Sequence, residues 1–276
     1  MFDLDAYLAR IALEERPAAD ADGLAALQRA HRLAIPFENL DVVLGRGIRI
    51  DSASVFAKLV TARRGGYCFE HNRLFLDALA ALGFEARALL ARVWLAATET
   101  PPLTHALSLV TIAGQGWIAD AGFGGSYAPV MPLAEGDAQA SDGARFRLDR
   151  DPVHGWMLSR DGHPGTTDGR STGAGFQPQY SFTLAPVWDA DLALSNHWTS
   201  AAPESRFLQI RLASKVLPQG MASLTGRDYR RRDGSDEAAF EIGDAEAYRE
   251  HLSEAFGIEL TVEDVAKLGL FAPAAG

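Results

Sequence analysis

The first third of the chain repeats its apolar residues with the period of an α-helix. Leu4, Leu8 and Ile11 fall at helical spacing. A second group of apolar residues begins with Leu24, and we expect Asp22 to cap its helix. The N-terminal segment therefore reads as a set of amphipathic helices.

Two further helices are expected before residue 85. One opens near Asp51, buries Val55 on its apolar face and stops at the glycine pair 65–66. The other runs over about 68–82, with Gly83 as its terminator. The start of this last helix closely follows the glycine pair 65–66, which interrupts helical structure.

From about residue 86 the hydrophobic period changes toward two, which is typical of strands. Segments 86–96, 105–112 and 116–121 are rich in Leu, Val and Ile and are separated by turn residues. The stretch 136–175 is full of Asp, Gly, Ser and Pro, so we expect hairpins and loops there. The middle third is predicted to be a mainly antiparallel sheet or small barrel, and after residue 196 strands and helices mix. The sequence as a whole indicates an α+β fold.

Composition narrows the class of protein. The chain has 276 residues, 47% hydrophobic and 22% charged, which is typical of a folded globular protein. Acidic residues outnumber basic ones 36 to 26, and the net charge of -10 argues against nucleic acid as a partner. The N-terminus is acidic where a signal peptide is basic, and charges interrupt the apolar stretch 78–97. We expect a soluble, cytoplasmic protein with no membrane partner.

The segment 63–72, RRGGYCFEHN, carries the only cysteine of the chain. Cys68 follows the glycine break and begins an apolar helix, where the positive end of the helix dipole favours a thiolate and hence a nucleophile. The alternative is an inert cysteine buried in the core. One cysteine forms no disulfide within the chain and excludes a zinc site built from several thiolates.

A cysteine nucleophile needs a base, and an imidazole base needs an acceptor that fixes its ring. His105 and Asp120 lie on consecutive predicted strands. A two-residue turn at Gly114-Gln115 puts both on one face of the sheet, but offset by four residues, about 13 Å, which is too far for a hydrogen bond. The pairing therefore needs another register, a bulge or strong twist; each residue taken alone would more often be structural.

Other histidines compete for the role of base. His71 lies three residues after Cys68 on the predicted helix, and His197 could line a cleft. The remaining four are expected on the surface: His31, His154, His163 and His251. Since the acids and histidines lack metal-ligand spacing, we expect no metal.

Five segments together resemble the arylamine N-acetyltransferase family, in its bacterial form. They are IPFENLD (35–41), RRGGYCFEHN (63–72), TH (104–105), DAGFGG (120–125) and SNHWTSAAPESRF (195–207). They occur in the family's order, and the resemblance extends over nearly the whole chain.

The resemblance implies a catalytic triad of Cys68, His105 and Asp120 in a cysteine-protease-like core. It also implies three parts: a helical bundle over 1–85, a β-barrel over 86–195 and an α/β lid over 196–276. The implied reaction is a ping-pong transfer of acetyl from acetyl-CoA, the cosubstrate, through a Cys68 thioester to the nitrogen of an arylamine or hydrazine.

The resemblance further implies binding residues. Those matching the acceptor pocket are Phe37, Phe123 and Phe207, and those matching the CoA contacts are Thr104 and Gly124. Glu38 and Arg64 match a structural ion pair. The basic run 230–232 is expected to be a solvated loop rather than a phosphate site.

Two other functions remain open from the residues. One is a thiol hydrolase or amide-forming condensing enzyme on the same scaffold, because a triad alone does not select the acceptor. The other is a non-enzymatic protein that binds aromatic ligands. The pattern does not decide between a monomer and a homodimer.

Overall fold

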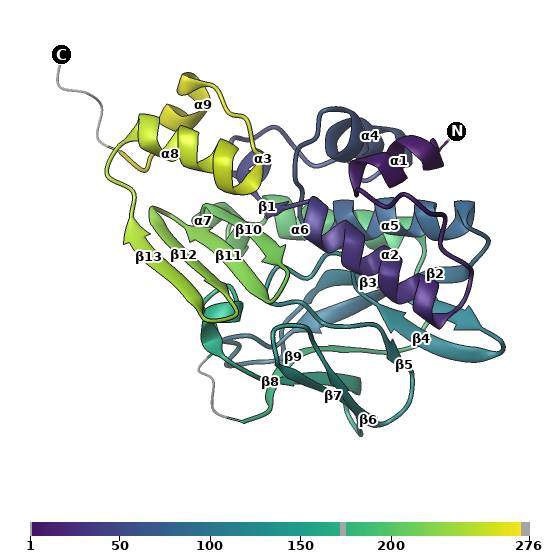
Figure 1. Cartoon of the computed structure of the whole chain (residues 1–276). Coiled ribbons are helices and arrows are strands. Elements are labelled where there is room, and N and C mark those ends of the chain that lie inside the picture. Colours follow the sequence, from purple (N-terminus) through teal and green to yellow (C-terminus); the bar gives the residue numbers. More distant parts are fainter. Residues whose placement is uncertain (1, 172–174, 272–276) are drawn as a thin grey trace, which may run out of the picture.

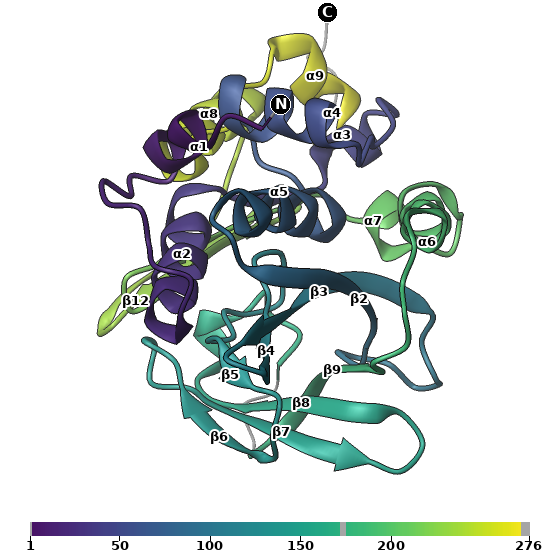
Figure 2. The ribbon, with the colours of Figure 1, turned by 90° about the vertical axis from the view of Figure 1, so that its right-hand side faces the viewer.

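The computed structural model describes residues 2–171 and 175–271 and shows an α+β fold, as predicted (Figure 1). Helices come first along the chain, a large antiparallel sheet follows, and a smaller antiparallel sheet with its own helices completes the fold. The α5 helix lies over strands β2 and β3 of the large sheet (Figure 2). This arrangement brings the helix that begins at Cys68 against the strand that carries His105.

Carboxylates cap the N-terminal helices. Asp51 accepts a hydrogen bond from the Ser54 N–H at 3.0 Å. The second helix is capped by Asp20 and not by Asp22 as predicted. The third helix ends before the glycine pair, where Arg63 adopts a φ of 54°. The helical segments are α1 (Leu4–Arg10), α2 (Ala21–Ala34), α3 (Leu40–Val43), α4 (Ser52–Phe56), the π-helix η1 (Ala57–Thr61) and α5 (Cys68–Ala81).

The apolar faces of these helices form one core. Leu24, Leu27, Phe75 and Leu79 are fully buried within it. Burial of each side chain of this size contributes roughly 1.5–3 kcal/mol. The α5 helix is therefore held as a rigid support for its N-terminus.

The large sheet has eight strands in the order β5-β4-β3-β2-β9-β8-β7-β6, all antiparallel. It curls into a nearly closed barrel around a core of its own (Figure 2). This confirms the predicted antiparallel middle third. Its strands are β2 (Glu85–Val93), β3 (Leu103–Ile112), β4 (Gln115–Ala119), β5 (Met131–Pro132), β6 (Gly136–Gln139), β7 (Arg145–Asp151), β8 (Gly155–Asp161) and β9 (Gln177–Phe182), and the 3-10 helix η2 (Pro164–Thr166) precedes β9.

The β3-β4 turn differs from the predicted one. Ala113 and Gly114 occupy it, with φ angles of 50° and 80°, so the turn lies one residue earlier than expected. Alanine rarely adopts a positive φ, which is why the pattern pointed elsewhere. The register now places Leu107 opposite Asp120, and His105 is offset by two residues instead of four.

The smaller sheet joins distant parts of the chain. Its order is β1-β10-β11-β12-β13, so a strand next to the cysteine loop pairs with the C-terminal part. These strands are β1 (Phe37–Glu38), β10 (Leu212–Leu217), β11 (Gly220–Thr225), β12 (Asp228–Asp233) and β13 (Asp236–Glu241). The basic run 230–232 lies within β12, so the loop prediction was wrong.

The last helical segments are α6 (Asp189–Ala201), α7 (Arg206–Gln209), α8 (Ala245–His251), the π-helix η3 (Leu252–Phe256) and α9 (Val262–Lys267). The α6 helix packs against β3 of the large sheet, and α6 and α7 connect the two sheets along the chain. The segments α8, η3 and α9 share one apolar core with the smaller sheet, and α9 packs against α8 (Figure 1). The boundary expected at residue 195 falls inside α6. The division into segments 1–85, 86–195 and 196–276 stays a prediction.

Candidate active site

The loop before Cys68 is shaped by a close backbone approach. A Cβ on Gly65 would lie 2.4 Å from the Pro36 carbonyl oxygen, so only glycine fits there. The Tyr67 N–H donates to Glu70 Oε2 at 3.0 Å and closes the first turn of α5. Cys68 is consequently held as the first residue of the helix.

The buried side chains of His105 and Asp120 are hydrogen-bonded to each other. His105 Nε2 and Asp120 Oδ2 lie 2.7 Å apart, and both side chains are 2% exposed. Asp120 Oδ1 also accepts from the Gly122 N–H at 2.9 Å. Burial alone raises the pKa of Asp120, but His105 and the Gly122 N–H outweigh it, and the pKa is lowered. Asp120 is therefore a carboxylate that orients the imidazole.

The thiol of Cys68 is buried. Its Sγ donates to the Thr104 carbonyl oxygen at 3.6 Å, and the residue is 3% exposed. Burial raises the pKa of the Cys68 thiol, and the charge of Asp120 raises it further, against a smaller opposing effect of nearby backbone N–H groups. The buried environment therefore opposes the thiolate that the helix N-terminus was expected to favour, and an ionised Cys68 stays a prediction. Ionisation requires that the proton be accepted by a neighbouring group.

Asn72 links these elements and was missed in the sequence. Its Nδ2 lies 3.1 Å from the Cys68 carbonyl oxygen, 2.5 Å from the Ala106 carbonyl oxygen and 3.3 Å from Asp120 Oδ1. The available signal was its position, four residues after Cys68 and hence on the same helix face. Asn72 ties the cysteine helix to β3, which carries His105, and to Asp120, which directly follows β4.

His71 belongs to a different network and does not serve Cys68. His71 Nε2 donates to the Pro36 carbonyl oxygen at 3.1 Å, which leaves Nδ1 to accept from His31 Nε2 at 2.8 Å. His31 Nδ1 then accepts from the Tyr7 hydroxyl at 2.9 Å. Burial lowers the pKa of His71 to about 3. His31, expected on the surface, is fully buried.

One cavity of about 370 Å³ contains most of the predicted site. The predicted residues that line it are Phe37, Cys68, Thr104, His105, Phe123, Gly124 and Phe207. Asp120 does not line this cavity but is hydrogen-bonded to His105, which does. His197 is exposed and does not line the cavity, whereas its neighbour Trp198 does. A larger cavity of about 580 Å³, between α4, α5 and α6, includes neither Cys68 nor His105. Size alone therefore does not select the reactive cavity.

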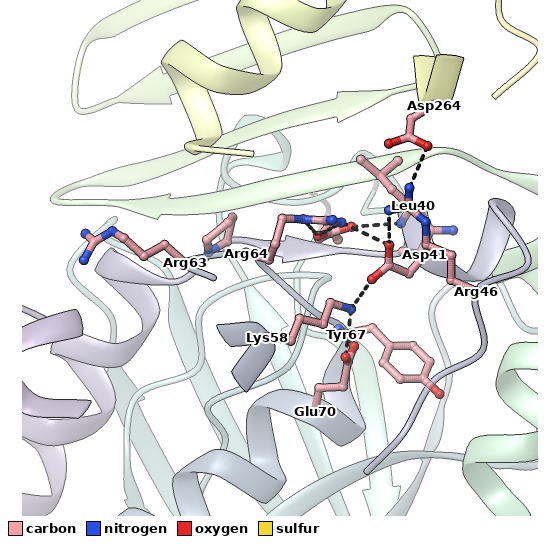
Figure 3. Close-up of polar contacts among 12 residues, drawn as sticks. Leu40, Asp41, Arg46, Lys58, Arg63, Arg64, Tyr67, Glu70 and Asp264 are labelled. Carbon is pink, nitrogen blue, oxygen red and sulfur yellow. Dashed lines mark hydrogen bonds and ion pairs between the residues drawn. The ribbon is translucent and has the colours of Figure 1, made fainter. Parts of the chain in front are cut away.

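A cluster of charges supports the cysteine loop from behind (Figure 3). Arg64 Nη2 contacts Glu38 Oε1 at 2.6 Å, which confirms the expected ion pair. Lys58 Nζ bridges Glu70 at 2.8 Å and Asp41 at 2.9 Å. Because Glu70 also caps the first turn of α5, the cluster fixes the place where the cysteine helix begins.

Asp41 is the centre of this cluster. Burial alone raises the pKa of Asp41, but Lys58 and Arg64 overcome it and lower the pKa to about 2. Arg46 contacts Asp41 at 3.1 Å and Asp264 of α9 at 2.6 Å. Residues far apart in the sequence are thus joined through a single carboxylate.

Over residues 2–171 and 175–271, no group of three or more His, Cys, Asp or Glu side chains is placed to hold a metal ion. None of the helices in this part of the chain has the length and apolar character needed to cross a membrane.

A buried cysteine that shares a cavity with an imidazole–carboxylate pair is typical of enzymes that pass an acyl group through a thioester. Residues 20–265 match the family model described as N-acetyltransferase. Arylamine N-acetyltransferase from Escherichia coli K12 is 39% identical over 79% of this chain and 74% of its own. The chain belongs to the arylamine N-acetyltransferase family, a family of acyltransferases, and the resemblance seen in its motifs is confirmed.

Other relatives cover still more of the chain. Arylamine N-acetyltransferase / N-hydroxyarylamine O-acetyltransferase from Salmonella typhimurium is 36% identical over 95% of this chain and 90% of its own. A solved arylamine N-acetyltransferase from Salmonella typhimurium superposes with a TM-score of 0.88, at 33% identity, over 97% of this chain and 98% of that one. The Mycobacterium marinum enzyme in complex with CoA gives 0.85 at 32% identity, over 96% and 98%.

Proposed function

We propose that the protein transfers an acetyl group from acetyl-CoA to the nitrogen of arylamines or arylhydrazines through a thioester on Cys68. The observation that carries this proposal is the shared cavity of Cys68 and His105, with His105 bonded to Asp120 at 2.7 Å. The relatives named for arylamine acetylation, and the relative solved with CoA, support the choice of acceptor and donor.

In the first half-reaction Cys68 loses its proton to His105 as Sγ attacks the carbonyl carbon of acetyl-CoA. Because His105 Nε2 faces Asp120, the proton goes to Nδ1. The resulting imidazolium is stabilised by the Asp120 carboxylate. The tetrahedral oxyanion collapses, the bond to the CoA sulfur breaks, and the CoA thiolate takes the proton from His105.

In the second half-reaction the amine nitrogen attacks the thioester carbon on Cys68. His105 accepts the proton that the nitrogen loses, and it returns this proton to Sγ as the carbon–sulfur bond breaks. The enzyme is restored and the amide leaves. A buried thiol with a raised pKa is compatible with this cycle, since His105 in the same cavity is proposed to accept the proton as Sγ attacks.

The oxyanion of each half-reaction needs hydrogen-bond donors. The Cys68 backbone N–H is a candidate because it belongs to the unpaired first turn of α5. Phe37, Phe123 and Phe207 supply flat apolar surfaces for an aromatic ring. Thr104 and Gly124 lie in the same cavity and are proposed to contact the donor. A Cβ on Gly124 would lie 2.7 Å from the Phe37 ring, so glycine allows this ring to approach the backbone.

Incubation with acetyl-CoA in the absence of amine tests the central step. We expect the wild-type protein to gain the mass of one acetyl group, located on Cys68 by peptide mapping. Cys68→Ala should gain none and should lose turnover while its thermal midpoint stays near that of the wild type. An unmodified wild type beside intact acetyl-CoA would contradict the proposal, and so would full activity of Cys68→Ala.

We further propose a cytoplasmic enzyme that works without a metal and acts as a monomer or homodimer. The acidic net charge of -10 supports a small-molecule acceptor rather than nucleic acid.

A further inference from the structure

Among the described residues, one arginine of the Cys68 cavity has a buried nitrogen without a hydrogen-bond acceptor. Arg206, the first residue of α7, lines the cavity. Its Nη1 is buried and has no hydrogen-bond partner among residues 2–171 and 175–271. A buried donor left without an acceptor costs about 1–3 kcal/mol, and more when it is charged. The side chain is therefore suited to an acceptor that enters the cavity.

A second arginine lies close to the first. Arg170 also lines the cavity, and its Nε donates to Asp168 Oδ2 at 2.7 Å. Burial lowers the pKa of Arg206, Arg170 lowers it further, and Asp168 acts in the opposite direction. Asp168 is a buried carboxylate that is hydrogen-bonded to Arg170, and among the described residues it forms no ion pair with Arg206. An added anion would compensate the charge of Arg206.

We propose that Arg206, assisted by Arg170, binds the carboxylate of an anionic arylamine, which makes aminobenzoate-type compounds preferred acceptors. This inference rests on the proposed acetylation of arylamines. A guanidinium matches a carboxylate through two parallel hydrogen bonds. Phe207, expected to contact the acceptor ring, directly follows Arg206 and lines the same cavity. In this proposal the acceptor ring lies against Phe207, its carboxylate binds Arg206 and its amine faces the Cys68 thioester.

The remaining acid of the cavity does not neutralise Arg206. Glu204 is exposed, and among the described residues no ion pair joins it to Arg206. A phosphate of the acyl donor has the same chemistry as a carboxylate toward arginine. The position beside Phe207 favours the acceptor, and the experiment separates the two sources.

The test compares 4-aminobenzoate with its neutral analogue 4-aminobenzamide at saturating acetyl-CoA. For each enzyme the ratio of kcat/KM for the two acceptors is measured. In Arg206→Gln we expect this ratio to fall about 10- to 100-fold relative to wild type, because a hydrogen-bonded charge pair is lost. Arg206→Lys keeps the charge without the paired hydrogen bonds, so its ratio should be intermediate. This second variant also serves if the glutamine variant does not fold.

Arg249→Gln is the matched control, because it removes the same charge from an arginine of α8 paired with Glu246. Its ratio should equal that of wild type. An unchanged ratio in both Arg206 variants would overturn the proposal. So would a rise in the KM for acetyl-CoA, measured with 4-aminobenzamide, without a change in the ratio, because this would assign the anion to the donor.

Failure of the proposed function has a different signature. In that case the wild type neither gains an acetyl group from acetyl-CoA nor turns over 4-aminobenzamide. If it does both while the acceptor ratio does not respond to Arg206, only the carboxylate site is wrong.

Discussion

The protein buries imidazoles in two places, and their partners make the two places chemically different. His105 is bonded to the carboxylate of Asp120. His31 and His71 are bonded to each other, and the pair ends at the uncharged carbonyl oxygen of Pro36. A carboxylate stabilises an imidazolium in the interior, whereas a carbonyl and a neutral ring provide little compensation for its charge.

Burial alone does not make a histidine reactive. Burial, with the neighbouring positive charges, lowers the pKa of His31 well below its ordinary value and that of His71 to about 3. Each ring of this pair holds one proton, on Nε2, at neutral pH. The pair is consequently a structural link between α2 and α5, and the proposed proton acceptor is the histidine that faces an acid.

Substitution of a histidine should change the enzymatic activity at one of the two sites and not at the other. His105→Gln should lower kcat by about 10²- to 10⁴-fold, because the acceptor of the thiol proton is gone. His71→Gln should retain turnover when the rate is expressed per folded molecule. Steady-state assays with an arylamine, corrected for the folded fraction by circular dichroism, measure both. The distinction between the sites fails if the two variants lose activity equally.

The pH dependence of stability tests the other site, the buried pair of His31 and His71. The pKa of His71 is about 3 in the folded protein and about 6.5 when unfolded, so the unfolded state binds more protons between these values. Stability should therefore fall as the pH is lowered from 6.5 toward 3, by about 1.4 kcal/mol per pH unit for this residue. Urea unfolding between pH 6.5 and 4.5 should show that His71→Gln has a slope shallower by about this amount.

His197→Gln is the control for this slope, because His197 is exposed on α6. Its stability should follow the wild-type pH dependence. An identical slope for His71→Gln would show that the buried pair does not carry the predicted proton linkage.

The smallest effect concerns the turn that sets the register of His105 against Asp120. Ala113 has a φ of 50° and precedes Gly114. Asparagine tolerates this conformation better than alanine, and Asn-Gly is favoured in such two-residue turns. Ala113→Asn should raise the free energy of unfolding by about 0.5–1 kcal/mol in urea titrations and leave kcat unchanged. A loss of stability would mean that the turn does not prefer this conformation.

Much of the fold was predictable because periodicity reports burial. The helix from Cys68 and the antiparallel strands follow directly from apolar spacing. The turn at Ala113 was not predictable, because it uses a residue that the turn preference disfavours. The strand at 230–232 was also missed, since the contacts of Arg231 and Arg232 with acids on β13 are set by strand pairing and not by apolar residues.

The site was predictable mainly through its motifs. They assembled the cavity residues, but spacing alone gave a separation of His105 and Asp120 that was too large. Asn72 contacts the Cys68 carbonyl oxygen of its own helix and the Ala106 carbonyl oxygen of β3. The contact with β3 joins distant segments of the chain, so no local pattern reveals it. The buried state of His31 and the raised pKa of the Cys68 thiol depend likewise on packing between distant segments.

The charge cluster behind the cysteine loop has a consequence for synthesis on the ribosome. Its central carboxylate, Asp41, is joined through Arg46 to Asp264, more than 200 residues later in the sequence. The nascent polypeptide therefore carries its nucleophile long before this contact of the supporting cluster exists. Full anchoring of the reactive helix must wait until Asp264 has been synthesised and α9 has folded.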